Sequence, residues 1–299
     1  YRKTMWFRNL QAYRITSGNI TLNSLEEALF NHALQPCLQM EMQSRGWVTP
    51  REEQQNFVHA YGQQWLIALG VEKKLLPAGV INQQAKDRLA KIEQMQGYKP
   101  GKKQIRDIKE ATIIELMPRA FTQRHKTYAW IDAIKNRLII DTASTQKADE
   151  LVEVLVKSMH GLTLAPLETQ VSPSAAMTRW LSGADLPSIF SIDRDCELQG
   201  MNDEKATVKY THHVLEAEET ARHIRAGKKV IKLAMTWDSK ISFVLHDNLQ
   251  LRRIAPQDIL KESTEDAEEL FVSDFAIMTG ELSQLITEMV DALGGEDLS

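Results

Sequence analysis

The segment GYKPGKKQIRDIKEATIIELMPRAF, residues 97–121, decides how the chain is organised. Apolar residues recur at helical spacing over 102–116, and a similar pattern runs over 80–95. The glycines and proline of 97–101 break the two patterns apart. The sequence therefore predicts an antiparallel helical hairpin over 77–116. Its apolar stripe is narrow and its charge density is high, so we expect it to project from the body.

Strand and helix patterns on both sides of the hairpin predict a first α+β lobe made of residues 5–76 and 117–166. Short runs rich in β-branched and aromatic residues indicate strands, and apolar residues at a spacing of three and four indicate helices. The predicted strands are Trp6–Thr16, Phe57–Tyr61, Gln64–Leu75 and a strand pair over Thr127–Ala143, with a short strand or turn over Gly46–Pro50, and the predicted helices are Leu22–Leu34 and Thr145–His160.

Residues 167–299 predict a second α+β lobe with acidic C-terminal helices. The alternation over Lys228–Asp238 is the clearest strand signal in the chain. The other expected elements are helices over Ser172–Leu181 and Ala217–Ala226, strands near Cys196–Leu198 and over Thr207–His212, Ile241–Leu245 and Leu249–Ile254, an acidic helix near Glu265 and a stronger helix after Gly280. The expected fold class is thus α+β, with two lobes of antiparallel sheets and packed helices.

Charge is segregated along the sequence. The formal net charge is −4, yet residues 73–137 hold 15 Lys and Arg against 6 Asp and Glu. Residues 262–299 hold 11 acidic residues and no basic ones. Either block alone is typical of a solvated charged surface. Together they indicate a molecule with separate electropositive and electronegative regions.

The composition is that of a globular protein kept in a reducing compartment. Hydrophobic residues make up 43% of the 299 residues, and two cysteines are too few for a disulfide framework. The sequence has no apolar run near the roughly 20 residues of a membrane helix, and no signal-peptide pattern at its start. We therefore expect a soluble, cytoplasmic protein.

The sequence offers no established catalytic motif. It lacks the phosphate-binding, dinucleotide-binding, nucleophile-elbow and zinc-protease signatures, so we expect no enzyme activity, catalytic residue, cofactor or metal. One alternative remains. If Asp193, Asp195 and Glu197 alternate along a strand, their carboxylates share one face, where a metal-dependent nuclease or phosphotransfer site could form. A calcium loop is disfavoured because Leu198 occupies the position that requires glycine.

The basic residues fit a nucleic-acid backbone, because Lys and Arg that neutralise phosphates release counterions without reading bases. No sequence-reading motif is present, so we expect sequence-independent binding. The candidates near the hairpin are Lys99, Lys102, Lys103, Arg106, Lys109 and Arg119, and those of the second lobe are Arg225, Lys228, Lys229 and Lys232. A third reading is a protein-interaction module whose acidic C-terminal helices bind a basic partner.

Seven short segments, in order along residues 5–296, resemble the recombination-associated protein RdgC family of proteobacteria. Thr236 departs from the family pattern, where an acidic residue is expected before the tryptophan. The segments are Trp6-Phe7-Arg8-Asn9-Leu10, Gly46-Trp47-Val48, Leu76-Pro77, Leu116-Met117-Pro118-Arg119-Ala120-Phe121, Trp130-Ile131-Asp132, Lys232-Leu233-Ala234-Met235-Thr236-Trp237 and Met278-Thr279-Gly280-Glu281-Leu282.

The resemblance implies a ring-shaped homodimer with a positively charged hole that encircles double-stranded DNA. It implies a nucleoid-associated protein that restrains the RecA recombinase by occupying DNA. It further implies that the hairpin and the segment with Phe121 form one of two subunit contacts. By composition alone Phe121 is more typical of an ordinary core aromatic.

Overall fold

The computed structural model describes residues 5–52, 54–184, 186–201, 205–258 and 266–298, and its strands form one antiparallel sheet. Ten strands lie side by side in the spatial order β2 (Gln43–Val48), β4 (Gln64–Lys74), β5 (Thr122–Asp132), β6 (Arg137–Asp141), β1 (Asn9–Ser17), β12 (Leu251–Pro256), β11 (Ile241–His246), β10 (Lys228–Trp237), β8 (Phe190–Gly200) and β9 (Thr207–Tyr210). Two shorter strands pair with members of this series: β3 (His59–Tyr61) pairs with β4, and β7 (Thr163–Pro166) pairs with β1.

The helices follow the sequence periodicity closely, and hydroxyl side chains cap several of them. Thr21, Ser144 and Ser172 each accept a hydrogen bond from a backbone N–H in the first turn of the helix that follows. Among the described residues, no helix is both long and apolar enough to cross a membrane. The helices are α1 (Leu22–Asn31), α2 (Ala78–Gln96), α3 (Lys102–Leu116), the short 3-10 helix η1 (Met117–Arg119), α4 (Thr145–Ser158), α5 (Pro173–Leu181), α6 (Ala217–Arg225) and α7 (Ala267–Ala292).

The two halves of the chain share this sheet, so the expectation of a separate sheet in each lobe is wrong. The connection is the start of β1, where Asn9 and Leu10 pair with Arg252 and Leu251 of β12. The backbone N–H of Ile254 also donates to the carbonyl oxygen of Arg8. Such a pairing joins residues far apart in sequence, and local patterning carries no signal for it.

The C-terminal region also differs from expectation, because α7 is one continuous helix that passes through Gly280. The acidic helix expected near Glu265 falls partly outside the described residues, and the described part begins at Ala267 of the same helix. A glycine inside a helix costs about 1 kcal/mol relative to alanine. The buried residues Phe275, Met278 and Leu282 on both sides of it outweigh that cost.

Two hydrophobic cores result from this arrangement. The smaller core lies between the sheet and helices α1 and α4, and it includes Leu25, Trp47 and Leu151. The larger core is continuous across both halves, because Trp130 of β5 and Trp237 of β10 belong to the same cluster of buried residues as the apolar side chains of α7.

Polar bonds fix α7 against each half. On the first half, the Ser283 hydroxyl donates to Asp132 Oδ2 at 2.7 Å, and Arg137 donates to the Thr287 hydroxyl at 3.2 Å. On the second half, Trp237 Nε1 donates to a carboxylate oxygen of Glu288 at 2.6 Å. The helix therefore braces one half of the sheet against the other.

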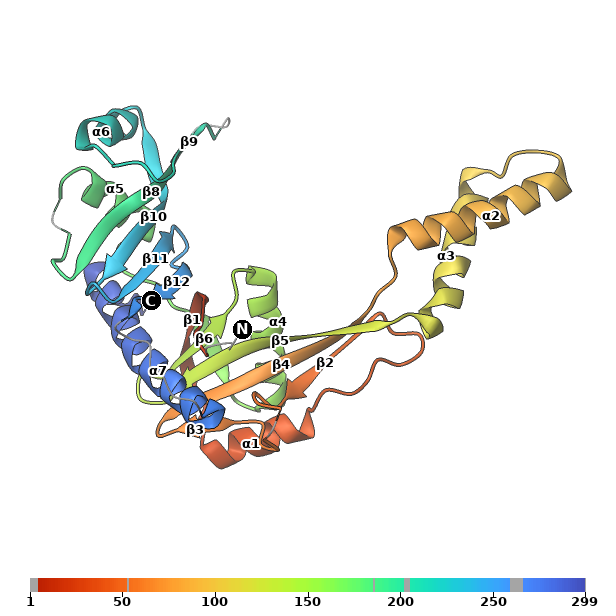
Figure 1. Ribbon diagram of the computed structural model, residues 1–299, viewed down its shortest axis with the longest axis horizontal. Coiled ribbons are helices and arrows are strands. Elements are labelled where there is room, and N and C mark those ends of the chain that lie inside the picture. The colour runs from red at the N-terminus through yellow and green to blue at the C-terminus, as the bar shows by residue number, and fades with distance from the viewer. Residues whose placement is uncertain (1–4, 53, 185, 202–204, 259–265, 299) are drawn as a thin grey trace.

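The molecule has the shape of a crescent (Figure 1). The long strands β4 and β5 run out from the body and carry α2 and α3 to one end, while α5, α6 and β8 to β11 form the other end. Between the two ends the molecule is open on one side, and α7 crosses the opposite, convex side. The fold thus presents one broad concave surface.

Two glycines with different backbone conformations should respond in opposite ways to alanine. Gly280 has helical neighbours and open space where a Cβ would go, so Gly280→Ala should raise the free energy of unfolding by about 0.5–1 kcal/mol. Gly97 ends α2 with a φ of 79°, so Gly97→Ala should destabilise the chain. Urea denaturation of both variants provides the measurement. An equal loss of stability in both would contradict the continuous α7.

Candidate nucleic-acid interface

The basic residues expected from sequence fall into two groups at opposite ends of the crescent. One group lies on the loop between α2 and α3, on α3 itself and on η1. The other lies at the end of α6 and on β10. Figure 1 places these elements on either side of the open concave surface. One chain therefore does not bring the two groups together, and only a ligand that spans the opening could contact both.

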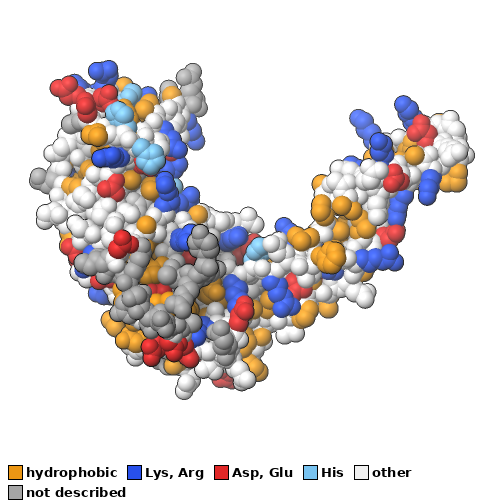
Figure 2. Space-filling view, in the orientation of Figure 1, with side chains coloured by type: hydrophobic (Ala, Val, Ile, Leu, Met, Phe, Trp, Pro, Cys, Tyr) orange, Lys and Arg blue, Asp and Glu red, His pale blue; other side chains and the backbone are white. Residues whose placement is uncertain are grey.

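The first group is exposed on the hairpin formed by α2 and α3. Lys102, Arg106 and Lys109 follow one another at a spacing of four and three, so they share a face of α3. Arg106 lies 3.8 Å from Glu110 and 3.9 Å from Asp107, which offsets part of its charge. Figure 2 shows Lys and Arg side chains on both edges of this end of the molecule, so the basic surface there is not confined to the concave side.

The second group is more structured. Lys228 and Lys229 begin β10 opposite Gly200 and Gln199 of β8, and Arg225 ends α6. Lys232 lies further along β10, where its ammonium group makes a 2.8 Å ion pair with Glu197. Strand alternation points Lys232 away from Leu233, which is buried against α5 and α7. The side chain of Lys232 therefore belongs to the face of the sheet that these helices leave uncovered.

This uncovered face contains a cavity of about 380 Å³ at the junction of the two halves. Four cationic and two acidic side chains line it, which leaves it with a net positive charge. Figure 2 shows Lys and Arg side chains gathered on the concave side of this end of the crescent. The lining residues are Asn9, Ala143, Asp195, Cys196, Glu197, Lys209, Tyr210, Lys232, Val244, His246, Arg252 and Arg253.

A β-bulge explains why sequence reasoning missed two of these cations. Arg252 and Arg253 are adjacent, and in a regular strand they would point to opposite faces of the sheet. In β12, however, Arg253 and Ile254 together oppose the single residue Phe243, and Arg253 has a φ of 55°. Both arginines therefore line the same cavity. The adjacent pair was a visible signal, but nothing local in the sequence indicates the bulge.

His246 is a buried imidazole in the wall of this cavity. Burial lowers its pKa, and the nearby charges of Arg252 and Lys232 lower it further, to about 4. The negative charge of Glu197 opposes this shift only in part. His246 is therefore neutral at pH 7, and the positive charge of the cavity comes from its lysines and arginines.

The alternative site of three carboxylates does not form as predicted. Asp193, Arg194 and Asp195 all oppose the single residue Ala234, so the strand is irregular at this place, although Asp195 and Glu197 still line one cavity. The three carboxylates have separate partners, namely the Thr236 hydroxyl for Asp193 at 2.9 Å, the backbone N–H of His212 for Asp195 at 2.8 Å and the ammonium group of Lys232 for Glu197.

No group of three or more His, Cys, Asp or Glu side chains is arranged to hold a metal ion within the part of the chain that the structure describes. Glu204, which would be the twelfth residue of a calcium loop that begins at Asp193, lies outside the described residues. His212 and His213 take part in no such group. His213 instead lies with its ring 5.6 Å from that of Tyr210.

Phe121 is 85% exposed, so the reading of this residue as a core aromatic is wrong. It lies where the hairpin joins β5, and its carbonyl oxygen accepts a hydrogen bond from the backbone N–H of Leu75. Leu75 is exposed as well, and so are Leu38 and Met40 in a loop whose carbonyls accept hydrogen bonds from the ammonium group of Lys74. Exposed apolar side chains at one place mark a contact surface.

A family model described as "Putative exonuclease, RdgC" matches residues 5–296. The chain belongs to the RdgC family. It is 48% identical over 98% of its length to the recombination-associated protein RdgC of Herminiimonas arsenicoxydans, and the match covers 99% of that protein. The corresponding proteins of Cupriavidus pinatubonensis and Bordetella pertussis are 47% and 44% identical over 98% of this chain and 99% of their own lengths.

The segments that resemble RdgC proteins lie largely in the hydrophobic cores. Phe7, Trp47, Trp130, Trp237 and Met278 are all buried to within 1% of full burial. These side chains contribute to the fold by removing large apolar surfaces from water. The residues shared with the RdgC family therefore account for the fold, and the role of each basic residue has to be argued from its own contacts.

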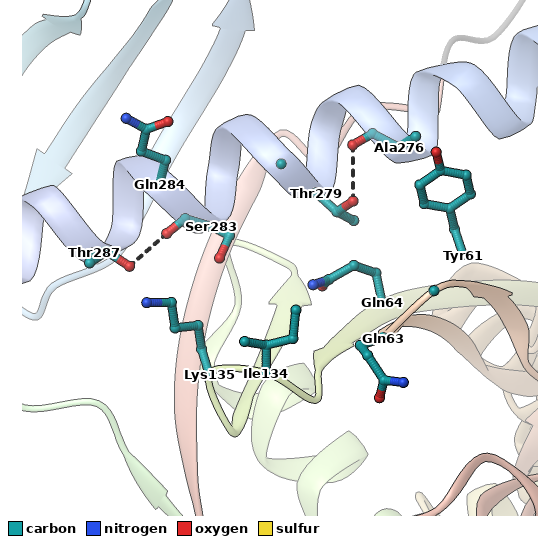
Figure 3. A pocket seen from close by; sticks show the side chains of 12 residues that line it. Tyr61, Gln63, Gln64, Ile134, Lys135, Ala276, Thr279, Ser283, Gln284 and Thr287 are labelled. Atoms are coloured by element: carbon teal, nitrogen blue, oxygen red, sulfur yellow. Dashed lines mark hydrogen bonds between the residues drawn. The ribbon is translucent and has the colours of Figure 1, made fainter.

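A second cavity, of about 530 Å³, lies where α7 meets the β3–β4 and β5–β6 turns (Figure 3). In Figure 3 the side chains of Thr279 and Ser283 on α7 lie on one side of it, and Gln64, Ile134 and Lys135 lie on the other, with Lys135 as its one charged lining residue. It differs in charge from the basic cavity, and its chemistry does not favour a polyanion such as a nucleic-acid backbone.

The buried imidazole of His246 should make stability depend on pH. Because its pKa is about 4 in the folded chain and about 6.5 when unfolded, the unfolded state binds more protons between these values. The free energy of unfolding should therefore fall as the pH drops from 6.5 towards 4, and this part of the loss should vanish in His246→Gln. Urea denaturation at several pH values, with exposed His212→Gln as control, measures it. Equal pH dependence of the wild type and His246→Gln would contradict the assignment.

Proposed function

We propose that two copies of the chain close into a ring that surrounds double-stranded DNA without reading its sequence. The observation that carries this proposal is the concave surface, which has exposed cations at both ends and a basic cavity in its wall. DNA phosphates favour such a surface because each neutralised phosphate releases counterions. The acidic remainder of the chain repels the same polyanion, which favours contact on the concave side.

Each part of the chain has a role in this proposal. Residues 5–76 and 117–166 form the first lobe, 77–116 the inserted hairpin and 167–299 the second lobe. The DNA contacts are Lys99, Lys102, Lys103, Arg106, Lys109, Arg119, Arg225, Lys228, Lys229 and Lys232. Ring occupancy of DNA in the nucleoid would restrain RecA by denying the recombinase its substrate, a role that agrees with the name recombination-associated protein given to the relatives.

Phe121 is the proposed apolar anchor between the two copies. Phe121 is 85% exposed in one chain, and full burial of such a side chain by a partner would contribute about 1.5–3 kcal/mol to the free energy of association. Exposed Leu38, Met40 and Leu75 extend the same contact surface. Aromatic anchors surrounded by smaller apolar contacts are typical of protein–protein interfaces.

A metal-dependent nuclease is the alternative, and the description of the family model as a putative exonuclease favours it. The proposal of a non-enzymatic DNA-binding protein is supported by the separate engagement of Asp193, Asp195 and Glu197 by three different partners. A metal site needs carboxylates that are free to share one ion.

Binding to unrelated duplexes should weaken steeply and similarly as salt increases. The logarithm of the binding constant should fall against the logarithm of salt concentration with a slope of about −0.9 per phosphate contacted. Replacing Lys102, Lys103 and Arg106 by Ala should weaken binding to every sequence and make that slope shallower. Fluorescence anisotropy over a range of salt concentrations measures both quantities.

The matched control replaces Arg45, Lys157 and Arg179 by Ala, which removes the same charge from β2, α4 and α5. Equal effects of the two triple variants, or strong preference for one sequence, would contradict the proposal. The same duplex should stay intact with Mg²⁺ or Mn²⁺. Cleavage that is lost in Asp193→Asn would establish the nuclease instead.

Ring closure should make the protein stay on circular DNA longer than on linear DNA. A closed ring can leave a linear duplex by sliding off its end, but it must open to leave a circle. Wild-type protein should therefore stay bound to nicked circular DNA during a high-salt wash, and cutting the circle into a linear duplex should release the protein. Phe121→Glu should abolish the difference, because a charge in an apolar contact is costly to desolvate.

Ile134→Glu is the control for this variant, since Ile134 is 67% exposed at a site away from the hairpin. Solution mass should give twice the 34.0 kDa of the chain for the wild type. A solution mass of one chain both with and without duplex, or equal retention of the protein on circular and linear DNA, would refute the ring.

A further inference from the structure

We infer that the basic cavity between β8, β10 and β12 is a built site for one phosphate group of a nucleic-acid backbone, with Arg252 as its fixed donor and Arg253 as its mobile one. This inference rests on the proposed function, which assigns DNA to the concave surface. It adds residues that sequence reasoning did not identify, and a defined chemical class of ligand. The cavity holds about 380 Å³, which is ample for a phosphate with its neighbouring sugar.

Arg252 is held in place before any ligand arrives. Its Nε donates to the side-chain oxygen of Gln250 at 2.9 Å, and its Nη2 donates to that oxygen and to the carbonyl oxygen of Ala143 at 2.9 Å. Among the described residues no acceptor faces its Nη1. The guanidinium plane is therefore fixed by neutral acceptors, and its charge and remaining N–H donors are left for an anion.

Arg253 has the opposite character. Its side chain is 73% exposed, and its one ion pair, with Asp195, has an N–O separation of 3.5 Å. Such an exposed pair contributes little to stability, so an arriving phosphate can replace the carboxylate at low cost. The bulge at Arg253 gives the strand the turn that lets both arginines face one ligand.

Two lysines complete the positive wall. The ammonium group of Lys232 is paired with Glu197, whereas that of Lys209, which lies opposite Glu197 in the β8–β9 ladder, has no hydrogen bond or ion pair among the described residues. The remaining wall contains Tyr210, neutral His246 and the side chain of Asn9, which can donate hydrogen bonds without adding charge. With four cationic and two acidic side chains in its lining, the cavity keeps a net positive charge, which favours an oxyanion over a metal cation.

The nucleic-acid backbone is the favoured source of this phosphate because the cavity opens on the concave surface, next to the cations of β9 and β10. A free phosphate ion would need only the cavity and none of the cations that lie beyond it. A backbone phosphate held in the cavity continues into neighbouring phosphates, and exposed Lys229 at the start of β10 can meet one of them.

Salt-dependent duplex binding by Arg252→Gln tests the inference. The variant should bind about ten- to hundredfold more weakly, because a charge-assisted hydrogen bond to a fixed arginine is lost. Its salt slope should be shallower by about 0.9, the value for one phosphate contact. Arg179→Gln removes the same charge from α5, on the covered face of the sheet, and should change affinity less than twofold.

Arg252→Lys distinguishes a built site from a diffuse positive field. It keeps the charge but loses the planar fork that Gln250 and Ala143 hold, so binding should fall well below that of the wild type. Wild-type affinity in Arg252→Lys would overturn the inference. Thermal unfolding and circular dichroism establish that each variant is folded, and Arg253→Gln, which changes an exposed side chain, repeats the test where Arg252→Gln fails to fold.

Inorganic phosphate at constant ionic strength separates the two sources of the anion. Saturable binding of free phosphate that depends on Arg252, together with duplex binding that does not, would overturn the backbone assignment. Absence of duplex binding by the wild-type chain would remove the proposed function itself. Duplex binding that Arg252→Gln retains in full, with an unchanged salt slope, would remove only the cavity.

Discussion

The angle between the two halves of the sheet depends on α7, because among the described residues the strands of the two halves pair at only two positions. Asn9 and Leu10 of β1 meet β12, and beyond them the same edge of β1 pairs with β7 instead. Helix α7 supplies the remaining contact by packing against one continuous core drawn from both halves. Each buried Leu or Phe of that helix contributes about 1.5–3 kcal/mol, and each neutral hydrogen bond about 1 kcal/mol. Apolar packing therefore holds the crescent, while the bonds to Asp132 and Trp237 set how the helix is positioned along it.

This geometry decides how the charges can act. At physiological salt the field of an exposed charge is screened over about 8 Å, so cations at the two ends of the crescent do not reinforce one another through solvent. They act together only on a ligand that extends from one end towards the other. A small anion in the cavity meets a positive charge that Glu197 and Asp195 reduce, and it gains nothing from the cations elsewhere on the crescent. The arrangement thus favours a long polyanion over a small one.

Sequence periodicity was sufficient for the local elements and failed where long-range contacts decide. The helices over 78–96 and 102–116 have apolar positions at helical spacing and glycines at their ends, so local physics defines them. Gly280 misled because a glycine at a helix stop and a glycine inside a helix look alike until its packing is known. The pairing of β1 with β12 has no local signal at all.

The candidate site shows the same division. Exposed cations of the hairpin were predictable, because a charged run on an amphipathic helix faces solvent. The arginine pair at 252 and 253 was not, since strand alternation predicts opposite faces and only the bulge reverses it. The carboxylates at 193, 195 and 197 lie beside a second irregularity, but Asp195 and Glu197 still line one cavity, and the argument against a shared metal is that each carboxylate has its own partner. Bulges depend on tertiary structure, and in this protein one of them brings Arg252 and Arg253 into the same cavity.

The exposed apolar contact at Phe121 limits how firmly a ring of two chains can close. Full burial of one phenylalanine contributes about 1.5–3 kcal/mol, and a contact of micromolar strength requires about 8 kcal/mol. In the proposed ring, the two Phe121 side chains together would contribute about 3–6 kcal/mol, which falls short of that value, so closure would need further contacts. Phosphate contacts at both ends of each crescent would add free energy only when the chains surround the same duplex. In the proposed ring, the DNA itself would then favour closure, and an increase in salt would favour opening by weakening those contacts.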